Sequence, residues 1–283
     1  MAKKIVLNAK YQSNGKGKGK KLKKLFMINR KVFSYPYILF LTLFVVAPLL
    51  LILINAFLVN GTFSFANFVD FFTESTSLKT LGNSLLVGCV TTVLCLVIGY
   101  PVAYILSKMD SGKVLVLLFV LPMWVNFLIR TLATKTIFES LGVRLGMETV
   151  IFGMVYNYLP FMILPLHTTL SGIDKSYTEA AYDLGADNIT SFLKITLPLS
   201  LPGIISGITM VFVPTISTFA ISQLLSNNQI LLFGDSINLK FSQDMYGVGS
   251  VMSIIMLLFV LISNWMIGRF QGKTTGEVRR NIW

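Results

Sequence analysis

The sequence predicts an all-α membrane protein with six transmembrane helices and a helix–turn–helix loop between the fourth and fifth. Of its 283 residues, 54% are hydrophobic and only 13% are charged, and the mean hydropathy is +0.73. Soluble domains carry about 25% charged residues. A water-exposed surface cannot accommodate so many apolar side chains, so we expect lipid to be the solvent for much of the chain.

Six apolar stretches are long enough to cross the roughly 30 Å hydrocarbon core of a bilayer. The predicted spans are 36–58, 81–106, 114–132, 150–170, 197–219 and 248–268. The first is too long for the core of a signal peptide, and no small-residue cleavage site follows it, so we expect it to remain as an uncleaved anchor. Residues 33–270 therefore make up the predicted membrane domain.

Basic residues indicate how this domain is oriented. Nineteen of the 24 Lys and Arg residues lie in the N-terminal tail, in the loops 107–113 and 171–196, and from Arg269 to the C-terminus. Loops rich in Lys and Arg face the cytoplasm. We therefore expect a multi-pass protein of the cell (inner or cytoplasmic) membrane with both termini in the cytoplasm, the C-terminal tail being 271–283.

The N-terminal tail, residues 1–31, holds eleven basic residues and no acidic residue. We expect a disordered cytoplasmic arm that contacts anionic membrane lipid. No aromatic platform or recognition fold accompanies the charge, so nucleic acid is not an expected partner.

The fifth predicted span, 197–219, is rich in residues that interrupt helices. A proline inside a helix leaves a backbone carbonyl that a neighbouring helix or water must satisfy. Such interruptions suit a helix that lines a pathway, and we expect this role for the fifth span. The residues concerned are Pro198, Pro202, Gly203, Gly207 and Pro214.

The loop before this span is polar and carries signals for two short helices. Ser176 and Glu179 have the spacing of a capping box, which predicts a helix from Tyr177 to Leu184. Gly185 is suited to the left-handed conformation that ends such a helix. Asp187 or Asn188 can then cap a second short helix that runs to Lys194.

The surface of this loop is unusual for its side of the membrane. Its acidic residues outnumber its basic residues, and Ala180 and Ala181 are small enough to let another surface approach the backbone. We therefore interpret residues 174–196 as a docking segment. The charged residues are Asp174, Lys175, Glu179, Asp183, Asp187 and Lys194.

The segment also resembles a known motif. Glu179-Ala180-Ala181, three residues, Gly185, nine residues, Ile195, one residue and Leu197-Pro198 match the EAA loop of type I ABC-importer permeases, and the match precedes the penultimate span as it does in that family. The resemblance implies the type I importer permease fold and a loop that sits in a cleft of a cytoplasmic ATP-binding subunit. It implies that the coupling residues are Glu179, Ala180, Ala181, Asp183 and Gly185.

A second resemblance concerns the cargo. Residues 211–249, together with YPYILFLTLFVVAPLL and LPMWVNFLIRTLA, are similar to spermidine/putrescine importer permeases, in particular the first of their two homologous permease subunits. This implies three kinds of partner: a dimer of cytoplasmic ATP-binding subunits, a second permease subunit and an extracytoplasmic substrate-binding protein. Permeases for ferric ion, phosphate and sulfate share parts of the pattern, so these cargoes stay open.

The chain lacks residues for catalysis of its own. It has no phosphate-binding loop of the Gly-x-x-x-x-Gly-Lys-[Ser/Thr] type, no recognisable nucleophile–base pair, and one histidine, His167, which cannot form a metal site alone. We expect no cofactor on this chain and no enzymatic activity. ATP with Mg²⁺ is expected on the partner ATPase.

A pathway for a flexible polycation should offer carboxylates and aromatic faces. Such residues lie in the outer half of the predicted membrane domain. The candidates are Trp124, Asn126, Glu139, Glu148, Tyr156, Asn157, Asp235, Asp244 and Tyr246.

Two other classes of protein were considered. A secondary transporter would need ionisable groups within its spans or inverted repeats; acidic residues are essentially absent from the six spans, and no repeat is evident. A membrane scaffold without transport activity is opposed on physical grounds only by the interrupted fifth span.

Overall fold

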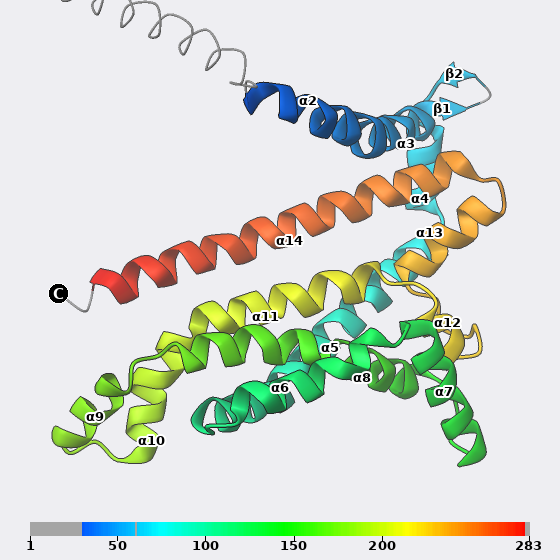
Figure 1. Ribbon diagram of the computed structural model, residues 1–283. Coiled ribbons are helices and arrows are strands. Elements are labelled where there is room, and N and C mark those ends of the chain that lie inside the picture. The colour runs from blue at the N-terminus through cyan, green and yellow to red at the C-terminus, as the bar shows by residue number, and fades with distance from the viewer. Residues whose placement is uncertain (1–29, 60, 281–283) are drawn as a thin grey trace, which may run out of the picture. The chain divides into compact units, whose positions relative to one another are not determined.

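The computed structural model describes residues 30–59 and 61–280 (Figure 1). The predicted basic arm, 1–31, therefore lies almost wholly outside the described residues, as does the end of the C-terminal tail. Within the described part, contacts divide the chain into two units, one ending at Ile54 and one beginning at Asn55.

The first unit is a single helical run. It consists of α2 (Arg30–Leu41), a π-helical turn η1 (Thr42–Val46) and most of α3 (Ala47–Phe57). From Tyr35 onward most of its side chains are exposed and apolar. Residues Tyr35–Phe57 are long and apolar enough to cross a membrane, in agreement with the predicted span 36–58.

The second unit is almost entirely helical. A short hairpin, β1 (Leu58–Val59) and β2 (Thr62–Phe63), pairs Leu58 with Phe63 and Val59 with Thr62. The helices are α4 (Ala66–Thr73), α5 (Ser75–Lys108), α6 (Gly112–Val120), η2 (Leu121–Trp124), α7 (Phe127–Ser140), α8 (Met147–Ser171), α9 (Lys175–Asp183), α10 (Asn188–Ser191), η3 (Phe192–Thr196), α11 (Leu197–Ser217), α12 (Ile221–Leu225), α13 (Phe233–Ser242) and α14 (Tyr246–Arg280).

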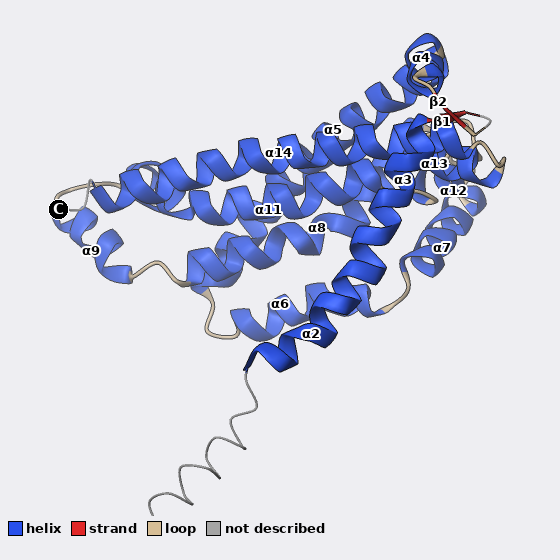
Figure 2. Cartoon of the chain, turned by 90° about the horizontal axis from the view of Figure 1, so that it is seen from above, coloured by secondary structure: helices blue, strands red, loops and turns tan. Residues whose placement is uncertain are grey.

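Helices α5, α8 and α11 pack pairwise and form the centre of this unit. Close approach between α11 and α8 depends on glycine, because a Cβ atom at Gly203 would lie 2.7 Å from Thr169 Oγ1 and one at Gly207 would lie 2.5 Å from Met162 Sδ. Small residues commonly bring membrane helices together in this way. Figures 1 and 2 show α8, α11 and α14 side by side.

The fifth span is a continuous helix, although the sequence predicted interruptions in it. The described helix is continuous from Asn188 to Ser217, with Pro202 and Pro214 inside it. The π-helical turn η3 joins α10 to α11 without a break. The two glycines serve helix packing in this structure, and the role of the span in a pathway stays a prediction.

The third span differs most from the prediction. Instead of one helix over 114–132, the chain bends by 87° between the segment Gly112–Trp124 and α7. Two local features explain the break: Pro122 has no backbone N–H to donate, and the Asn126 side chain accepts a hydrogen bond of 2.8 Å from Leu128 N, which caps a new helix. Gly112–Trp124 alone rises about 20 Å, less than a membrane core.

The second, fourth and sixth spans agree with the prediction in position and extend beyond the predicted bounds at both ends. Five described helices are long and apolar enough to cross a membrane, and six are counted if the bent pair is one span. Helix α5, with 34 residues, extends on both sides of the predicted 81–106. At about 1.5 Å per residue, its length exceeds the membrane core, so its ends project beyond the lipid.

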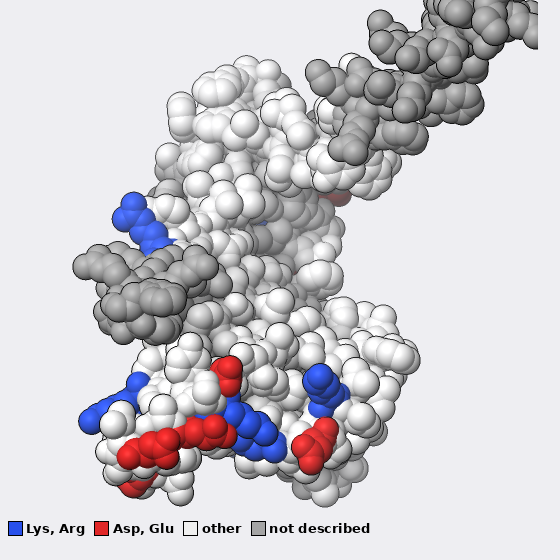
Figure 3. Space-filling view, turned by 60° about the vertical axis from the view of Figure 1, so that its left-hand side comes forward, with Lys and Arg blue, Asp and Glu red and all other residues white. Residues whose placement is uncertain are grey.

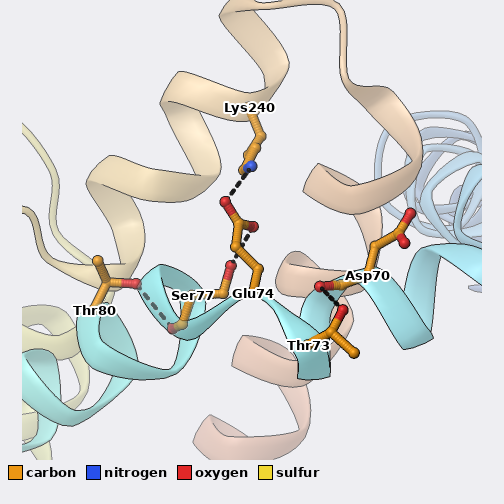
Figure 4. A network of polar contacts seen from close by, with 6 residues as sticks. All are labelled: Asp70, Thr73, Glu74, Ser77, Thr80 and Lys240. Atoms are coloured by element: carbon orange, nitrogen blue, oxygen red, sulfur yellow. Dashed lines mark hydrogen bonds and ion pairs between the residues drawn. The ribbon is translucent and has the colours of Figure 1, made fainter.

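A polar network fastens α13 to the start of α5 (Figure 4). Glu74 Oε1 accepts a hydrogen bond of 3.0 Å from Lys240 Nζ, and Glu74 Oε2 accepts one of 2.9 Å from Ser77 Oγ. The hydrogen bond from Lys240 is the largest cause that lowers the pKa of the Glu74 carboxyl. This ion pair joins residues that are 166 positions apart in the sequence.

Candidate functional site

The docking segment begins with a helix cap that differs from the one predicted. Asp174, not Ser176, is the N-cap of α9: its carboxylate accepts a hydrogen bond of 2.9 Å from Ser176 N. The predicted Ser176–Glu179 capping box is therefore wrong. Asp caps a helix at least as well as Ser, and the Asp174 cap starts the helix at Lys175. The hydrogen bond from the Ser176 backbone lowers the pKa of the Asp174 carboxyl.

The turn at Gly185 is confirmed. Gly185 has φ of +82°, the left-handed region that glycine adopts without strain. Its N–H donates to Tyr182 O at 2.9 Å, and Ala186 N–H donates to Ala181 O at 2.9 Å. These two bonds form a Schellman motif, which closes the end of α9 and turns the chain sharply.

The second short helix begins where the sequence predicted. Asp187 caps α10, with Thr190 N donating to Asp187 Oδ1 at 3.3 Å. A hydrogen bond of 2.9 Å from Tyr182 Oη to Asn188 Oδ1 joins α9 to α10 across the turn. The segment is therefore a rigid pair of short helices at one end of the second unit.

The exposed surface of this segment is partly apolar at its tip. Leu184 is 90% exposed and Ile189 is 68% exposed, while Glu179, Ala180 and Asp183 also face outward. Figure 3 shows acidic and basic side chains gathered around this end. Contact of Leu184 and Ile189 with another protein would remove their apolar surface from water, which is favourable.

The structure corrects the prediction for Ala181. The sequence predicted that Ala180 and Ala181 together form an approach surface, but Ala181 is buried within the chain. Adjacent helical residues point about 100° apart, so one alanine faces outward and the other inward. Ala181 supports the fold of the segment, and Leu184 is an exposed residue that the sequence analysis did not select.

Aromatic side chains connect the docking segment to the helix core. The ring of Phe192, in η3, lies edge-on to Tyr104 of α5 at 5.4 Å and to Tyr100 at 5.9 Å between ring centroids. The hydroxyls of Tyr100 and Ser200 are 2.9 Å apart. Movement of the short helices would therefore reach both α5 and α11. π-Helical turns are rare and recur at functional sites.

A cavity of about 520 Å³ lies at the opposite end of α8 and α11 from the docking segment. It is bounded by the break between η2 and α7, by α8 and by the end of α11. Trp124, at its edge, is 83% exposed, whereas Asn157 is only 3% exposed. The lining residues are Met123, Trp124, Val125, Asn126, Phe127, Arg130, Asn157, Tyr158, Phe161, Thr218 and Ile221.

Three of the predicted pathway residues, Trp124, Asn126 and Asn157, thus line this cavity, which we call the outer cavity. Asn157 Nδ2 donates to Gly153 O at 2.8 Å, but within the described residues Asn157 Oδ1 has no hydrogen-bond partner although it is buried. Tyr156 lies behind the same wall, in a second cavity of about 390 Å³, where the Arg130 guanidinium stacks over its ring at 5.7 Å. Arg130 lines both cavities.

Asp235, a predicted pathway residue, lines neither of these two cavities. Its side chain is 0% exposed and accepts hydrogen bonds from Ala220 N at 3.0 Å, from Leu232 N at 2.9 Å and from Ser222 Oγ. Burial raises the pKa of its carboxyl. The sequence predicted a pathway residue, but Asp235 lies in the first turn of α13 and binds the start of α12, so it holds the segment that carries Thr218 and Ile221 into the cavity wall.

The remaining candidates lie elsewhere. Asp244 and Tyr246 are exposed between α13 and α14, where Tyr246 Oη donates to Asp244 Oδ1 at 3.0 Å. Neither lines the outer cavity. Glu139 pairs with Lys135 at 3.7 Å along α7. Arg130 was not selected from the sequence; a basic residue inside the predicted apolar span 114–132 was the available signal.

These features define a class of protein: a multi-pass, all-α membrane protein with a capped polar docking segment at one end and a cavity at the other. The chain matches the family described as binding-protein-dependent transport system inner membrane component over residues 17–276. It therefore belongs to this family of inner-membrane transport components.

The similar proteins include two curated bacterial relatives. The spermidine/putrescine transport system permease protein PotB of Escherichia coli is 33% identical over 262 residues, 82% of this chain and 95% of the relative. PotB of Haemophilus influenzae is 35% identical over 226 residues, 71% of this chain and 79% of the relative.

A solved structure has the same fold. In the crystal structure of a bacterial alginate ABC transporter in complex with an alginate pentasaccharide-bound periplasmic protein, one chain matches with a TM-score of 0.65 at 15% identity, covering 89% of this chain and 97% of that chain. At this identity the likeness establishes the fold alone.

Proposed function

We propose that this chain is one of two permease subunits of an ATP-binding-cassette importer whose cargo is a polyamine. The support is that relatives at 33% and 35% identity, matched over most of their length, are spermidine/putrescine permeases. Residues LPMWVNFLIRTLA, among those that suggested this cargo in the sequence, form the break beside the outer cavity. The cargo is delivered by an extracytoplasmic substrate-binding protein.

The docking segment couples the chain to an ATP-binding subunit in the cytoplasm. The observation that carries this proposal is the exposed Leu184 at the tip of a turn closed by a Schellman motif. The side chain enters an apolar cleft of the ATPase, and acidic residues around it contact the rim. ATP and Mg²⁺ bind to the ATPase dimer, which supplies the energy.

This assignment orients the chain. The docking segment, both termini and the loop 107–113 lie in the cytoplasm, while α7, α12, α13 and the outer cavity lie on the opposite side. The excess of Lys and Arg on the cytoplasmic loops supports this orientation. Closure of the ATPase moves α9 and α10, and the Phe192 contacts transmit that movement to α5 and α11.

The outer cavity provides part of the pathway. A polyamine is a flexible chain of ammonium groups joined by methylenes, so it favours aromatic faces and neutral oxygen acceptors. Trp124, Tyr158 and Phe161 supply the aromatic walls, and Asn157 Oδ1 supplies a free acceptor. Each ammonium group passes from water to these groups in turn.

The test uses the complete complex in lipid vesicles. The expected result is that ATP hydrolysis rises when the binding protein is loaded with spermidine or putrescine and does not rise when sulfate, phosphate or ferric ion is offered. A response to one of those ions alone would show that the ion is the cargo, and the chain would still be a permease of an ATP-binding-cassette importer. Transport by the isolated chain without ATP would overturn the proposal.

The cavity is tested with two tryptophans. Trp124→Ala removes an aromatic face from the proposed path and is expected to raise the KM for polyamine uptake about tenfold, a loss of roughly 1.4 kcal/mol. Trp265→Ala is the control, because Trp265 is exposed as Trp124 is but lies on α14, which does not line the cavity. Equal effects of the two variants would remove Trp124 from the pathway.

A further inference from the structure

Arg130 is a cation with two buried nitrogens that have no acceptor within the described residues. It lies on α7, one turn after the break in the third span, and its side chain is half-buried. Among the described residues, no hydrogen-bond partner reaches its Nε or Nη1, both of which are buried. Its guanidinium stacks over Tyr156 at 5.7 Å, which holds it in place without satisfying its N–H groups.

Two other basic residues at the same end have carboxylate partners. Lys135, on α7 as well, lies 3.7 Å from Glu139, and Lys240 lies 3.0 Å from Glu74. A guanidinium stays protonated at any physiological pH. Buried N–H groups without a partner are unfavourable, so Nε and Nη1 of Arg130 favour an acceptor from outside the described part of the chain.

The surroundings of Arg130 resemble the centre of a protein interface. Trp124, Val125 and Ile129 are exposed around the cavities that Arg130 lines. Aromatic residues and arginine are enriched at protein interfaces, whose buried centres are apolar. Acyl chains of lipid carry no acceptor for a guanidinium.

The charge of Arg130 also conflicts with an approaching polyamine. An ammonium group near Asn157 would be repelled by an unneutralised guanidinium in the same cavity wall. A carboxylate on Arg130 would remove this repulsion and leave Asn157 Oδ1 free to accept from the cargo. The partner group is therefore an anion, and it must be fixed beside the pathway.

We propose that Arg130 binds a carboxylate of the sister permease subunit, and that this ion pair locks the two permeases together beside the outer cavity. The inference rests on the proposed function, because that function supplies the second permease. Arg130 is a positioning residue: it joins the subunits and neutralises the wall, and it does not contact the cargo.

The experiment measures assembly of the whole importer with tagged subunits in detergent. Arg130→Gln is expected to weaken retention of the sister permease about 30-fold or more, as loss of one member of a buried ion pair does at interfaces. Arg130→Glu is expected to be worse, and Arg130→Lys intermediate. Lys135→Gln is the matched control, on the same helix with its own partner, and is expected to assemble normally.

A charge-reversal variant distinguishes loss of the ion pair from misfolding of the chain. In cells that depend on imported polyamine and carry Arg130→Glu, selection for growth is expected to yield suppressors in the sister permease that change an acidic residue to Lys or Arg. A photo-crosslinking residue placed at Trp124 is expected to capture the sister permease.

Three results would overturn the inference: normal assembly of Arg130→Gln, suppressors confined to this chain, or capture of lipid in place of the sister subunit, which would point to a headgroup phosphate as the anion. Failure of the proposed function looks different. In that case the unmodified chain would not purify with a second permease at all.

Discussion

The two ends of the second unit are built in opposite ways. At the docking end, the stabilising contacts join neighbours in the sequence, such as Asp174 with Ser176 and Tyr182 with Asn188. At the outer end, they join distant segments: Phe233 N donates to Ser84 Oγ at 2.7 Å across 149 positions, and Thr149 Oγ1 donates to Leu225 O at 2.7 Å across 76. One end is stiffened by capping, and the other depends on the assembled fold.

This difference suits the proposed roles. A docking segment closed by its own caps can move as a unit, because its shape does not depend on the helices it pushes. A cavity wall that is held by long-range hydrogen bonds changes when those helices shift. Substitutions at the docking end should therefore affect coupling, whereas those at the outer end should affect stability.

The largest effect is expected at Asp235. Asp235→Ala leaves the N–H groups of Ala220 and Leu232 buried without an acceptor, and we expect a loss of about 2–4 kcal/mol in the free energy of unfolding. Thermal unfolding of the purified protein measures the change. Asp244→Asn removes an exposed charge just after α13 and keeps a residue that tolerates the positive φ of +59° at this position, so it should leave the midpoint unchanged. Equal shifts would show that the outer end does not depend on this buried carboxylate.

The next effect is expected at Leu184. Leu184→Asp places a charge in the proposed apolar cleft and should weaken binding of the ATPase about 30-fold, or roughly 2 kcal/mol, as at other interface hot spots. Leu141→Asp is the matched control at the opposite end, where Leu141 is 70% exposed at the end of α7. Co-purification with the ATPase gives the comparison. Tight binding by the Leu184 variant would reject the tip as the contact point.

The turn at Gly185 should tolerate residues according to their backbone preferences. A Cβ atom there meets nothing within 4 Å, so only the positive φ opposes substitution. Gly185→Val should cost about 1–2 kcal/mol and reduce uptake driven by ATP, while Gly185→Asn, which tolerates this conformation, should retain most of it. The ratio of transport to ATP hydrolysis is the readout, and identical ratios for Val and Asn would contradict the model of a rigid turn.

The smallest effect is expected at the Lys240–Glu74 pair. The Glu74 side chain is 37% exposed, so solvent screens the interaction and Lys240→Met should cost less than about 1 kcal/mol. Because the pKa of Glu74 is lowered in the folded protein, the pair stabilises fully above the carboxyl's ordinary pKa, and this contribution is lost as the pH falls through the lowered value.

An acid titration of stability tests that sign. The difference in unfolding midpoint between wild type and Lys240→Met should be largest near neutral pH and should vanish in acid. A difference that grows on acidification would mean that Glu74 is not the partner that matters.

The sequence by itself determined the features that arise from neighbouring residues. Hydropathy located the spans, the asymmetry of Lys and Arg predicted their orientation, and Gly185 with Asp187 predicted the turn and second cap of the docking segment. These signals are local because the chemistry of a bilayer and of a helix end acts over a few residues. Even here, the choice of Asp174 over Ser176 as the first cap was missed, since both are good caps.

Only the tertiary structure decided the rest. The burial of Asp235, the lack of a partner for Arg130 among the described residues and the inward face of Ala181 each depend on which helices pack beside the residue. A side chain's charge and polarity follow from its residue type, but segments far along the chain determine how exposed it is to solvent and which groups it contacts. For that reason a loop acid that was predicted to face the cargo instead holds the cavity wall, and an overlooked arginine lies between two cavities.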